Sequence, residues 1–90
     1  MSNLTHGMDI GAVRQLGQFL QSEATSQIRD LMGRIDSQLS SAGWQGNDAE
    51  QFRSEWQNHK NTLNQIINSL EQFGQKAQQN AQAQEQTSAS

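Results

Sequence analysis

Apolar residues recur at every third or fourth position along two long stretches of this chain, with polar residues between them. Such spacing places the apolar side chains on one face of an α-helix. In residues 9–42 the apolar stripe consists of Val13, Leu16, Leu20, Ala24, Ile28, Leu31, Ile35, Leu39 and Ala42. In residues 48–77 it consists of Ala49, Phe52, Trp56, His59, Leu63, Ile66, Leu70, Phe73 and Ala77. Each stretch is therefore predicted to be one helix.

The residues between the two stripes, 43–47, predict a turn that folds the helices back on each other. Gly43 suits the left-handed conformation that ends a helix, and Trp44 would then contact the last helical turn at Leu39. The run Asn47–Glu50 has the spacing of a helix N-cap and its return partner. The predicted fold is an all-α antiparallel two-helix hairpin. Folding about the turn aligns the stripes, pairing Leu39 with Phe52, Ile35 with Trp56, Leu31 with His59, Ile28 with Leu63, Ala24 with Ile66 and Leu20 with Leu70.

A hairpin of this size and polarity needs a partner. Hydrophobic residues make up only 32% of the chain, and one small core seldom supplies more than about 3–5 kcal/mol. Phe19, Met32 and Ile67 lie beside the stripes and widen the apolar surface, so we expect two hairpins to form a four-helix bundle. The residues expected to pack within and between hairpins are Leu16, Phe19, Leu20, Ile28, Leu31, Met32, Ile35, Leu39, Phe52, Trp56, Leu63, Ile66, Ile67 and Leu70.

Two glycines and the two ends of the chain interrupt this regular pattern. Gly17 and Gly33 each cost the first helix about 1 kcal/mol relative to alanine. Either another helix approaches them closely, or they are tolerated defects. Residues 1–8 are expected to be a flexible lead-in to the hairpin. Residues 78–90 are polar with alanine as their main apolar residue, so they are expected to be a disordered tail.

Composition and charge narrow the range of partners. The net charge is −3 and the basic residues are scattered, which argues against nucleic acid binding. There is no cysteine, hence no disulfide or thiolate. The N-terminus lacks the charged start and apolar core of a cleavable signal peptide. No apolar run approaches the roughly 20 residues that cross a bilayer, so stable membrane insertion is not expected. These features alone favour a cytoplasmic location.

The sequence contains no convincing catalytic or metal site. His59 follows Glu55 by one helical turn, a pair that can ligate zinc, but a third ligand is not evident. A histidine that is at least half-buried and hydrogen-bonded across the hairpin is the favoured interpretation. No serine has a base and an acid arranged beside it, so we expect neither enzymatic activity nor a cofactor. Trp56 is expected in the core, whereas Trp44 is expected either to pack at the helix ends or to dock a partner.

The arrangement of these residues resembles a known family. The central Trp44-Gln45-Gly46 is followed by apolar residues in step with a second helix, a polar segment follows, and the chain is short. In this respect residues 9–77 are similar to the WXG-motif, early-secreted-antigen-like proteins. That family is exported by type VII (ESX) secretion systems and is associated with virulence. The resemblance implies that Trp44 and Gly46 form the secretion motif.

The resemblance also implies partners and an export route. Family members fold in the cytoplasm, pair as homodimers or as heterodimers with another WXG-motif chain, and are secreted without a cleaved signal peptide. The secretion-system ATPase recognises a C-terminal Tyr-x-x-x-Asp/Glu signal beside the partner's Trp-x-Gly. This chain has no tyrosine, and Phe73 and Ala77 stand at the corresponding positions. Either these two form a relaxed signal, a partner chain carries the signal, or the protein is not exported in its own right.

The expected function is that of a non-enzymatic secreted protein, a substrate and dimerising partner of a type VII secretion system. The main alternative is an intracellular helical-bundle adaptor or scaffold that is not exported. It explains the apolar stripes equally well, but it does not explain a tryptophan in the turn. A membrane-active helical protein is disfavoured, because the composition is polar and there is no basic amphipathic face.

Overall fold

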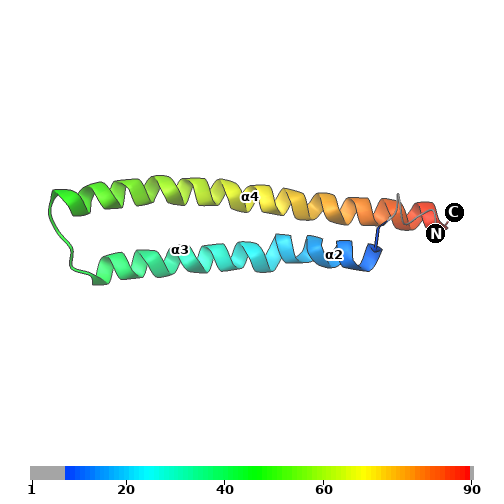
Figure 1. The fold of residues 1–90 in the computed structure, drawn as a ribbon, viewed down its shortest axis with the longest axis horizontal. Coiled ribbons are helices and arrows are strands. Elements are labelled where there is room, and N and C mark those ends of the chain that lie inside the picture. The colour runs from blue at the N-terminus through cyan, green and yellow to red at the C-terminus, as the bar shows by residue number, and fades with distance from the viewer. Residues whose placement is uncertain (1–7, 90) are drawn as a thin grey trace.

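The computed structural model describes residues 8–89, and these form a long helical hairpin (Figure 1). Its elements are α2 (Ile10–Gln18), the π-helical turn η1 (Phe19–Glu23), α3 (Ala24–Ser41) and α4 (Asn47–Ala89). The first three elements form one rod, and α4 lies antiparallel beside it, giving a body of 66 × 17 × 17 Å. No strand occurs between residues 8 and 89. The all-α antiparallel hairpin predicted from the sequence is therefore confirmed.

Local signals in the sequence set the helix ends. The Asp9 carboxylate accepts a hydrogen bond of 3.0 Å from the Ala12 amide, which caps the start of α2. Gly43 has a φ of 62°, the left-handed conformation expected of the residue that follows α3. Helix α4 begins at Asn47, and the preceding Gly46 carbonyl accepts from the amide of Glu50. The cap position is thus Gly46, one residue before the one predicted.

The predicted disordered tail is wrong for residues 78–89, because α4 continues as a helix to Ala89. This segment packs against α2 at the open end of the hairpin. The Ala81 side chain is fully buried there, and the Gln78 amide donates to the Arg14 carbonyl at 3.3 Å. Arg14 also pairs with Glu85 at 2.5 Å. Alanine buries little area, but it allows a neighbouring helix to approach and favours helix formation. Of the predicted flexible lead-in, residues 1–7 lie outside the described part of the chain.

The two rods approach each other closely where Gly17 and Gly74 face each other. A Cβ atom built on Gly17 would lie 2.8 Å from the Gly74 carbonyl oxygen, and one built on Gly74 would lie 2.6 Å from the Gly17 carbonyl oxygen. Of the two explanations left open for the glycines, close helix approach therefore applies to Gly17. It does not apply to Gly33, where an added Cβ would meet nothing within 4 Å.

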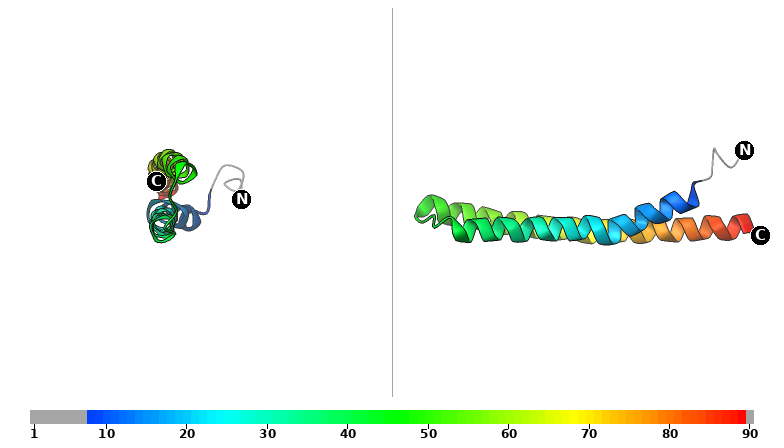
Figure 2. Two further views of the ribbon diagram at one scale, coloured as in Figure 1. Left: turned by 90° about the vertical axis from the view of Figure 1, so that its left-hand side faces the viewer. Right: turned by 90° about the horizontal axis from the view of Figure 1, so that it is seen from below.

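The π-helical turn lies directly after this close contact. In η1 the Ser22 hydroxyl donates to the Gln18 carbonyl, and at the start of α3 the Thr25 hydroxyl donates to the carbonyls of Gln21 and Ser22. Hydroxyl bonds of this kind to the preceding turn are associated with helix bending. The rod changes direction here, so that α2 leaves the line of α3 (Figure 2). A π turn also shifts which residues face the neighbouring helix.

The buried seam is consequently not the one predicted. Met32 and Ile67, expected beside the seam as surface for a second hairpin, are buried at 8% and 2% exposure. The expected pair of Leu31 with His59 is wrong, since both side chains are exposed. The reason is that Ile67, Gly74 and Ala81 recur every seven residues on the side of α4 that faces the first rod. Other expected core residues lie half-buried at its edges: Leu20, Ala24, Ile28, Ile35, Leu39, Trp56, Leu63 and Leu70. The remaining expected core residues are exposed: Leu16, Phe19, Phe52 and Ile66.

Candidate functional site

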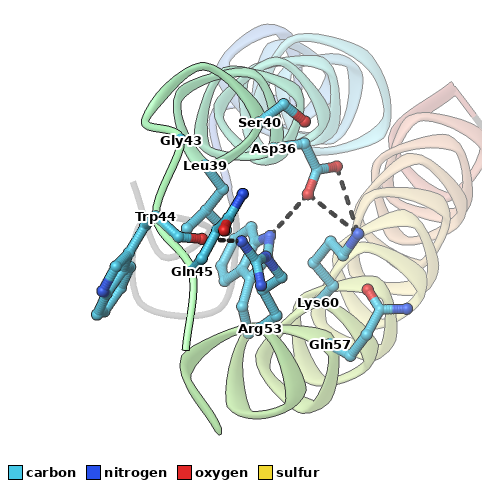
Figure 3. A pocket seen from close by; sticks show the side chains of 10 residues that line it. Asp36, Leu39, Ser40, Gly43, Trp44, Gln45, Arg53, Gln57 and Lys60 are labelled. Atoms are coloured by element: carbon cyan, nitrogen blue, oxygen red, sulfur yellow. Dashed lines mark hydrogen bonds and ion pairs between the residues drawn. The ribbon is translucent and has the colours of Figure 1, made fainter. Parts of the chain in front are cut away.

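The turn holds Trp44 outside the hydrophobic seam. Gly43 and Gly46, with φ values of 62° and 107°, allow the chain to reverse on either side of it. The Trp44 side chain is 40% exposed. Its ring lies 5.3 Å from that of Phe52, tilted by 55°, and the Arg53 guanidinium donates to its backbone carbonyl. Figure 3 shows the indole pointing away from the helices. The sequence left packing and docking open for Trp44, and this geometry is that of a supported but accessible aromatic side chain.

An open hollow of about 530 Å³ lies on the inner side of the turn (Figure 3). Leu39 and Trp56 give it apolar walls, and Asp36, Arg53 and Lys60 supply charged groups. The cations are already engaged, since Arg53 donates to the Trp44 carbonyl and Lys60 pairs with Asp36. The contacts of these two cations hold the turn in place, so neither cation is free to bind a ligand.

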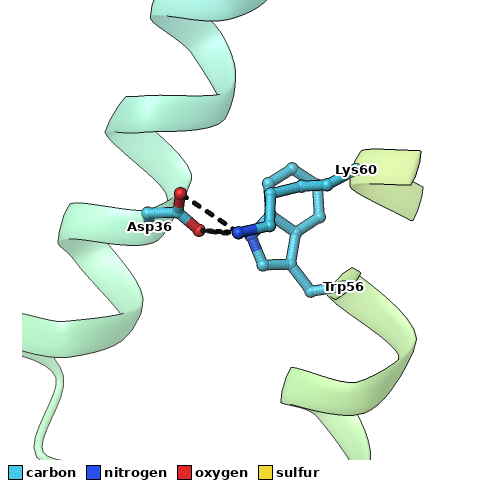
Figure 4. Close-up of polar contacts among 3 residues, drawn as sticks. All are labelled: Asp36, Trp56 and Lys60. Atoms are coloured by element: carbon cyan, nitrogen blue, oxygen red, sulfur yellow. Dashed lines mark hydrogen bonds and ion pairs between the residues drawn. The ribbon is translucent and has the colours of Figure 1, made fainter. Parts of the chain in front are cut away.

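A polar cluster joins α3 to α4 beside this hollow (Figure 4). The Trp56 indole N–H donates to Asp36 Oδ1 at 2.7 Å, and Lys60 Nζ lies 3.1 Å from Oδ1 and 3.3 Å from Oδ2 of the same carboxylate. The hydrogen bond from Trp56, followed by that from Lys60, holds the pKa of Asp36 below its ordinary value. This cluster was not predicted from the sequence. The available signal was Trp56 and Lys60 one turn apart on α4, opposite an acid beside the apolar stripe.

One face of α4 carries a row of large, exposed side chains. Phe52, His59, Ile66 and Phe73 follow one another at seven-residue intervals, which places them on one face of the helix, and we call them the α4 stripe. All four are exposed, and Phe73, at 62%, is the most exposed large apolar residue in the described part of the chain. The face continues onto α3, because a hollow of about 250 Å³ beside Phe52 is lined by Ile35, Gln38 and Leu39.

His59 differs from the prediction of a histidine at least half-buried and bonded across the hairpin. Its side chain is exposed, and within residues 8–89 it makes no hydrogen bond or ion pair. The physical reason is the rotation of α4 that turns Ile67 inward and leaves the stripe outside. His59 therefore lies on a surface, between two exposed apolar residues of the same stripe.

The residues expected to form the export motif are not brought together within one chain. Trp44 is in the turn, whereas Phe73 and the half-buried Ala77 lie near the other end of the hairpin. From the start of α4 at Asn47 to Phe73 the helix rises by about 40 Å. A surface that combines Trp44 with Phe73 would therefore require a second chain.

The rest of the described chain offers no further candidate site. Between residues 8 and 89, no three or more His, Cys, Asp or Glu side chains lie where they could hold a metal ion. None of the described helices has the length and apolar character needed to cross a bilayer. Comparison with protein-family models, curated proteins and solved structures finds no match to this chain. Function is therefore argued from its own residues and geometry.

Proposed function

We propose that this protein is a non-enzymatic substrate, and a pairing partner, of a type VII secretion system. One observation carries the proposal: the tryptophan of Trp44-Gln45-Gly46 lies in the turn of a helical hairpin with its side chain exposed. A large exposed aromatic side chain at a fixed position is the type of residue that contributes most to a protein–protein contact. This placement supports the resemblance to WXG-motif proteins, in which the same tryptophan belongs to the export surface.

The turn prepares Trp44 for docking. Contact with Phe52 and the hydrogen bond from Arg53 restrict the side chain and backbone before any partner arrives. Less conformational freedom is then lost on binding, which favours affinity. The proposed receptor is the secretion-system ATPase.

A second copy of this chain is the partner that fits the α4 stripe. The stripe is symmetric about its midpoint, with a phenylalanine at each end. An antiparallel second copy therefore places its own Phe73 level with Phe52, and its own Ile66 level with His59. Such symmetric contacts, in which the same patch is used twice, are typical of homodimers.

Charges beside the stripe favour the same orientation. The next row outward repeats at the same spacing, with Asp48 and Glu55 towards the turn and Lys76 at the far end. An antiparallel second copy brings its Lys76 level with Asp48. In a parallel two-fold pair this row of one copy lies opposite the other edge of the stripe, so Lys76 and Asp48 do not meet. Exposed pairs add little affinity, but they select orientation. A related WXG-motif chain would be recognised by the same face.

This pairing also provides the surface that one chain lacks. Phe73 of the second copy comes to the turn end of the first chain, level with Phe52 and therefore close to Trp44. Phe73 and Ala77 then act as a relaxed C-terminal signal beside the Trp-x-Gly of the other chain. An intracellular adaptor would use the α4 stripe equally well, but it gives no role to the exposed indole.

The test is export from a bacterium that has a type VII system. Trp44→Arg removes the indole at an exposed position, so we expect the amount in the medium to fall at least tenfold while the total and the helical circular dichroism stay unchanged. Ser41→Arg is the matched control, because it adds the same charge at an exposed position near the turn. Phe73→Ser should reduce export in the same way. Normal export of Trp44→Arg would refute the role of the motif, and retention of the wild-type chain would support the adaptor.

A further inference from the structure

We propose that Arg53 is the residue that positions Trp44 for docking, although Arg53 itself lies outside the docking surface. The inference rests on the secretion function proposed above and adds the contact on which the presentation of the indole depends. It starts from the turn, which has few bonds of its own. Of residues 43–46, all of which the structure describes, only Gly46 takes part in a backbone–backbone hydrogen bond.

The glycines of the turn do not hold it in one conformation either. Gly43 and Gly46 flank the exposed tryptophan, and glycine has more backbone freedom than any other residue. A Cβ atom built on either glycine would meet nothing within 4 Å, so packing does not restrict them. Fixing such a segment costs conformational entropy. A contact from elsewhere in the chain is therefore needed to keep Trp44 in place.

Two consecutive residues of α4 supply that contact. The Phe52 ring lies against the indole, and the Arg53 guanidinium donates to the Trp44 carbonyl. Phe52 restricts the ring, whereas Arg53 restricts the peptide plane that follows Trp44 and hence the direction in which the side chain leaves the backbone. A hydrogen bond from a charged donor is roughly twice as strong as one between neutral groups. Arg53 is thus the side chain that holds the backbone of the turn.

Arg53 has no other bond among the described residues. The Trp44 carbonyl is its only hydrogen-bond or ion-pair partner within residues 8–89. By contrast, Arg14, Arg29 and Lys60 each pair with an acid across the hairpin. Figure 3 shows Arg53 on the inner side of the turn, beside the hollow, while the indole points away from it. A receptor can therefore bind the indole without touching Arg53, which acts through Trp44.

Nitrogen-15 relaxation tests the positioning without any receptor. In the wild type the Trp44 and Gln45 amides should have order parameters of about 0.8, and in Arg53→Gln these should fall below about 0.6. Arg53→Lys keeps a charged donor and should lie between the two. Arg34→Gln is the matched control, because it removes the same charge from an exposed pair within α3. The amides of α4 should stay rigid in every variant, which shows that the hairpin is intact.

Export tests whether the positioning matters for function. Arg53→Gln should reduce the amount in the medium about tenfold, because docking must then order the turn. Arg53→Lys should reduce it less, and Arg34→Gln should leave it unchanged. Added to Trp44→Arg, the change Arg53→Gln should cause no further fall, since no indole is left to position.

The outcomes separate this inference from the function on which it rests. Rigid turn amides in Arg53→Gln overturn it, and so does a mobile turn with normal export. A further fall in export when Arg53→Gln is added to Trp44→Arg also overturns it, because Arg53 would then act independently of the indole. In all three cases the secretion function still stands on the Trp44→Arg result. Normal export of Trp44→Arg alone overturns the function and this inference together.

Discussion

At the scale of single residues, the side chains with the clearest polar contacts join the two rods of the hairpin. Asp36 accepts from both Trp56 and Lys60, and this contact joins the two rods close to the turn. At the other end, Arg14 pairs with Glu85. Both carboxyl groups have pKa values below their ordinary range, Asp36 chiefly through the Trp56 hydrogen bond and Glu85 chiefly through the Arg14 hydrogen bond. The folded state therefore favours their ionised forms.

Acid should accordingly loosen the hairpin through Asp36. Because its pKa is lower when folded, its contribution is fully present above the pKa of the unfolded chain, about 4, and is lost as the pH falls towards the folded value. In Asp36→Asn, urea unfolding should show lower stability at neutral pH and a smaller further loss between about pH 5 and about pH 2. Asp30→Asn is the control, since it makes the same charge change in an exposed pair within α3. An acid dependence in Asp36→Asn equal to that of wild type would contradict this account.

At the scale of helices, the smallest residues decide how the rods pack. Gly17 and Gly74 let the two backbones approach at the open end, and Ala81 extends that contact by seven residues. The π-helical turn η1 then changes the direction of the first rod. Together these features turn Ile67 inward and leave Phe52, Ile66 and Phe73 outside. The exposed face of the hairpin thus follows from where its small residues lie.

Two alanine substitutions in the same rod should act in opposite directions. In Gly17→Ala the new methyl group meets the Gly74 carbonyl at 2.8 Å, so the rods must separate, and we expect a loss of about 1–3 kcal/mol in the free energy of unfolding. Gly33→Ala has open space around it and should gain up to about 1 kcal/mol from helix propensity. Urea unfolding measures both. Equal gains from the two substitutions would show that Gly17 makes no tight contact in solution.

At the scale of the whole molecule, the hairpin is long, thin and incompletely covered. A body of 66 × 17 × 17 Å has little interior, and Leu16, Leu31 and Phe73 are each more than half exposed. In the α4 stripe such exposed apolar side chains stand in one row, and a grouped apolar surface marks an interaction site. Covering it with a second copy would supply the core that one hairpin lacks.

Pairing should therefore depend on the centre of the α4 stripe. Ile66→Lys places a charge where His59 of the second copy would lie, so we expect the dissociation constant of the pair to rise at least tenfold at neutral pH. Asn64→Lys adds the same charge at an exposed position two residues away, outside the stripe, and should pair like wild type. Sedimentation equilibrium measures both. If both variants pair as the wild type does, the α4 stripe is not the interface.

The regular spacing of apolar residues predicted the two helices, and Gly43 predicted where the first one ends. Those features depend on contacts between residues close in sequence, which is why they could be derived without coordinates. The position of Trp44 in the turn followed from the same local signals. Its exposure did not, because its contact with Phe52 depends on how α4 is rotated.

The sequence by itself thus determined that this chain forms two helices and where they reverse, since helix periodicity and turn chemistry act locally. Only the tertiary structure decided which side of each helix is buried, because an apolar stripe this wide is compatible with several rotations. The contact of Gly17 with Gly74 and the turn η1 select one of them. The helical structure of residues 78–89 was likewise decided by tertiary contacts. It depends on the pairing of Glu85 with Arg14, which lies 71 positions away along the chain.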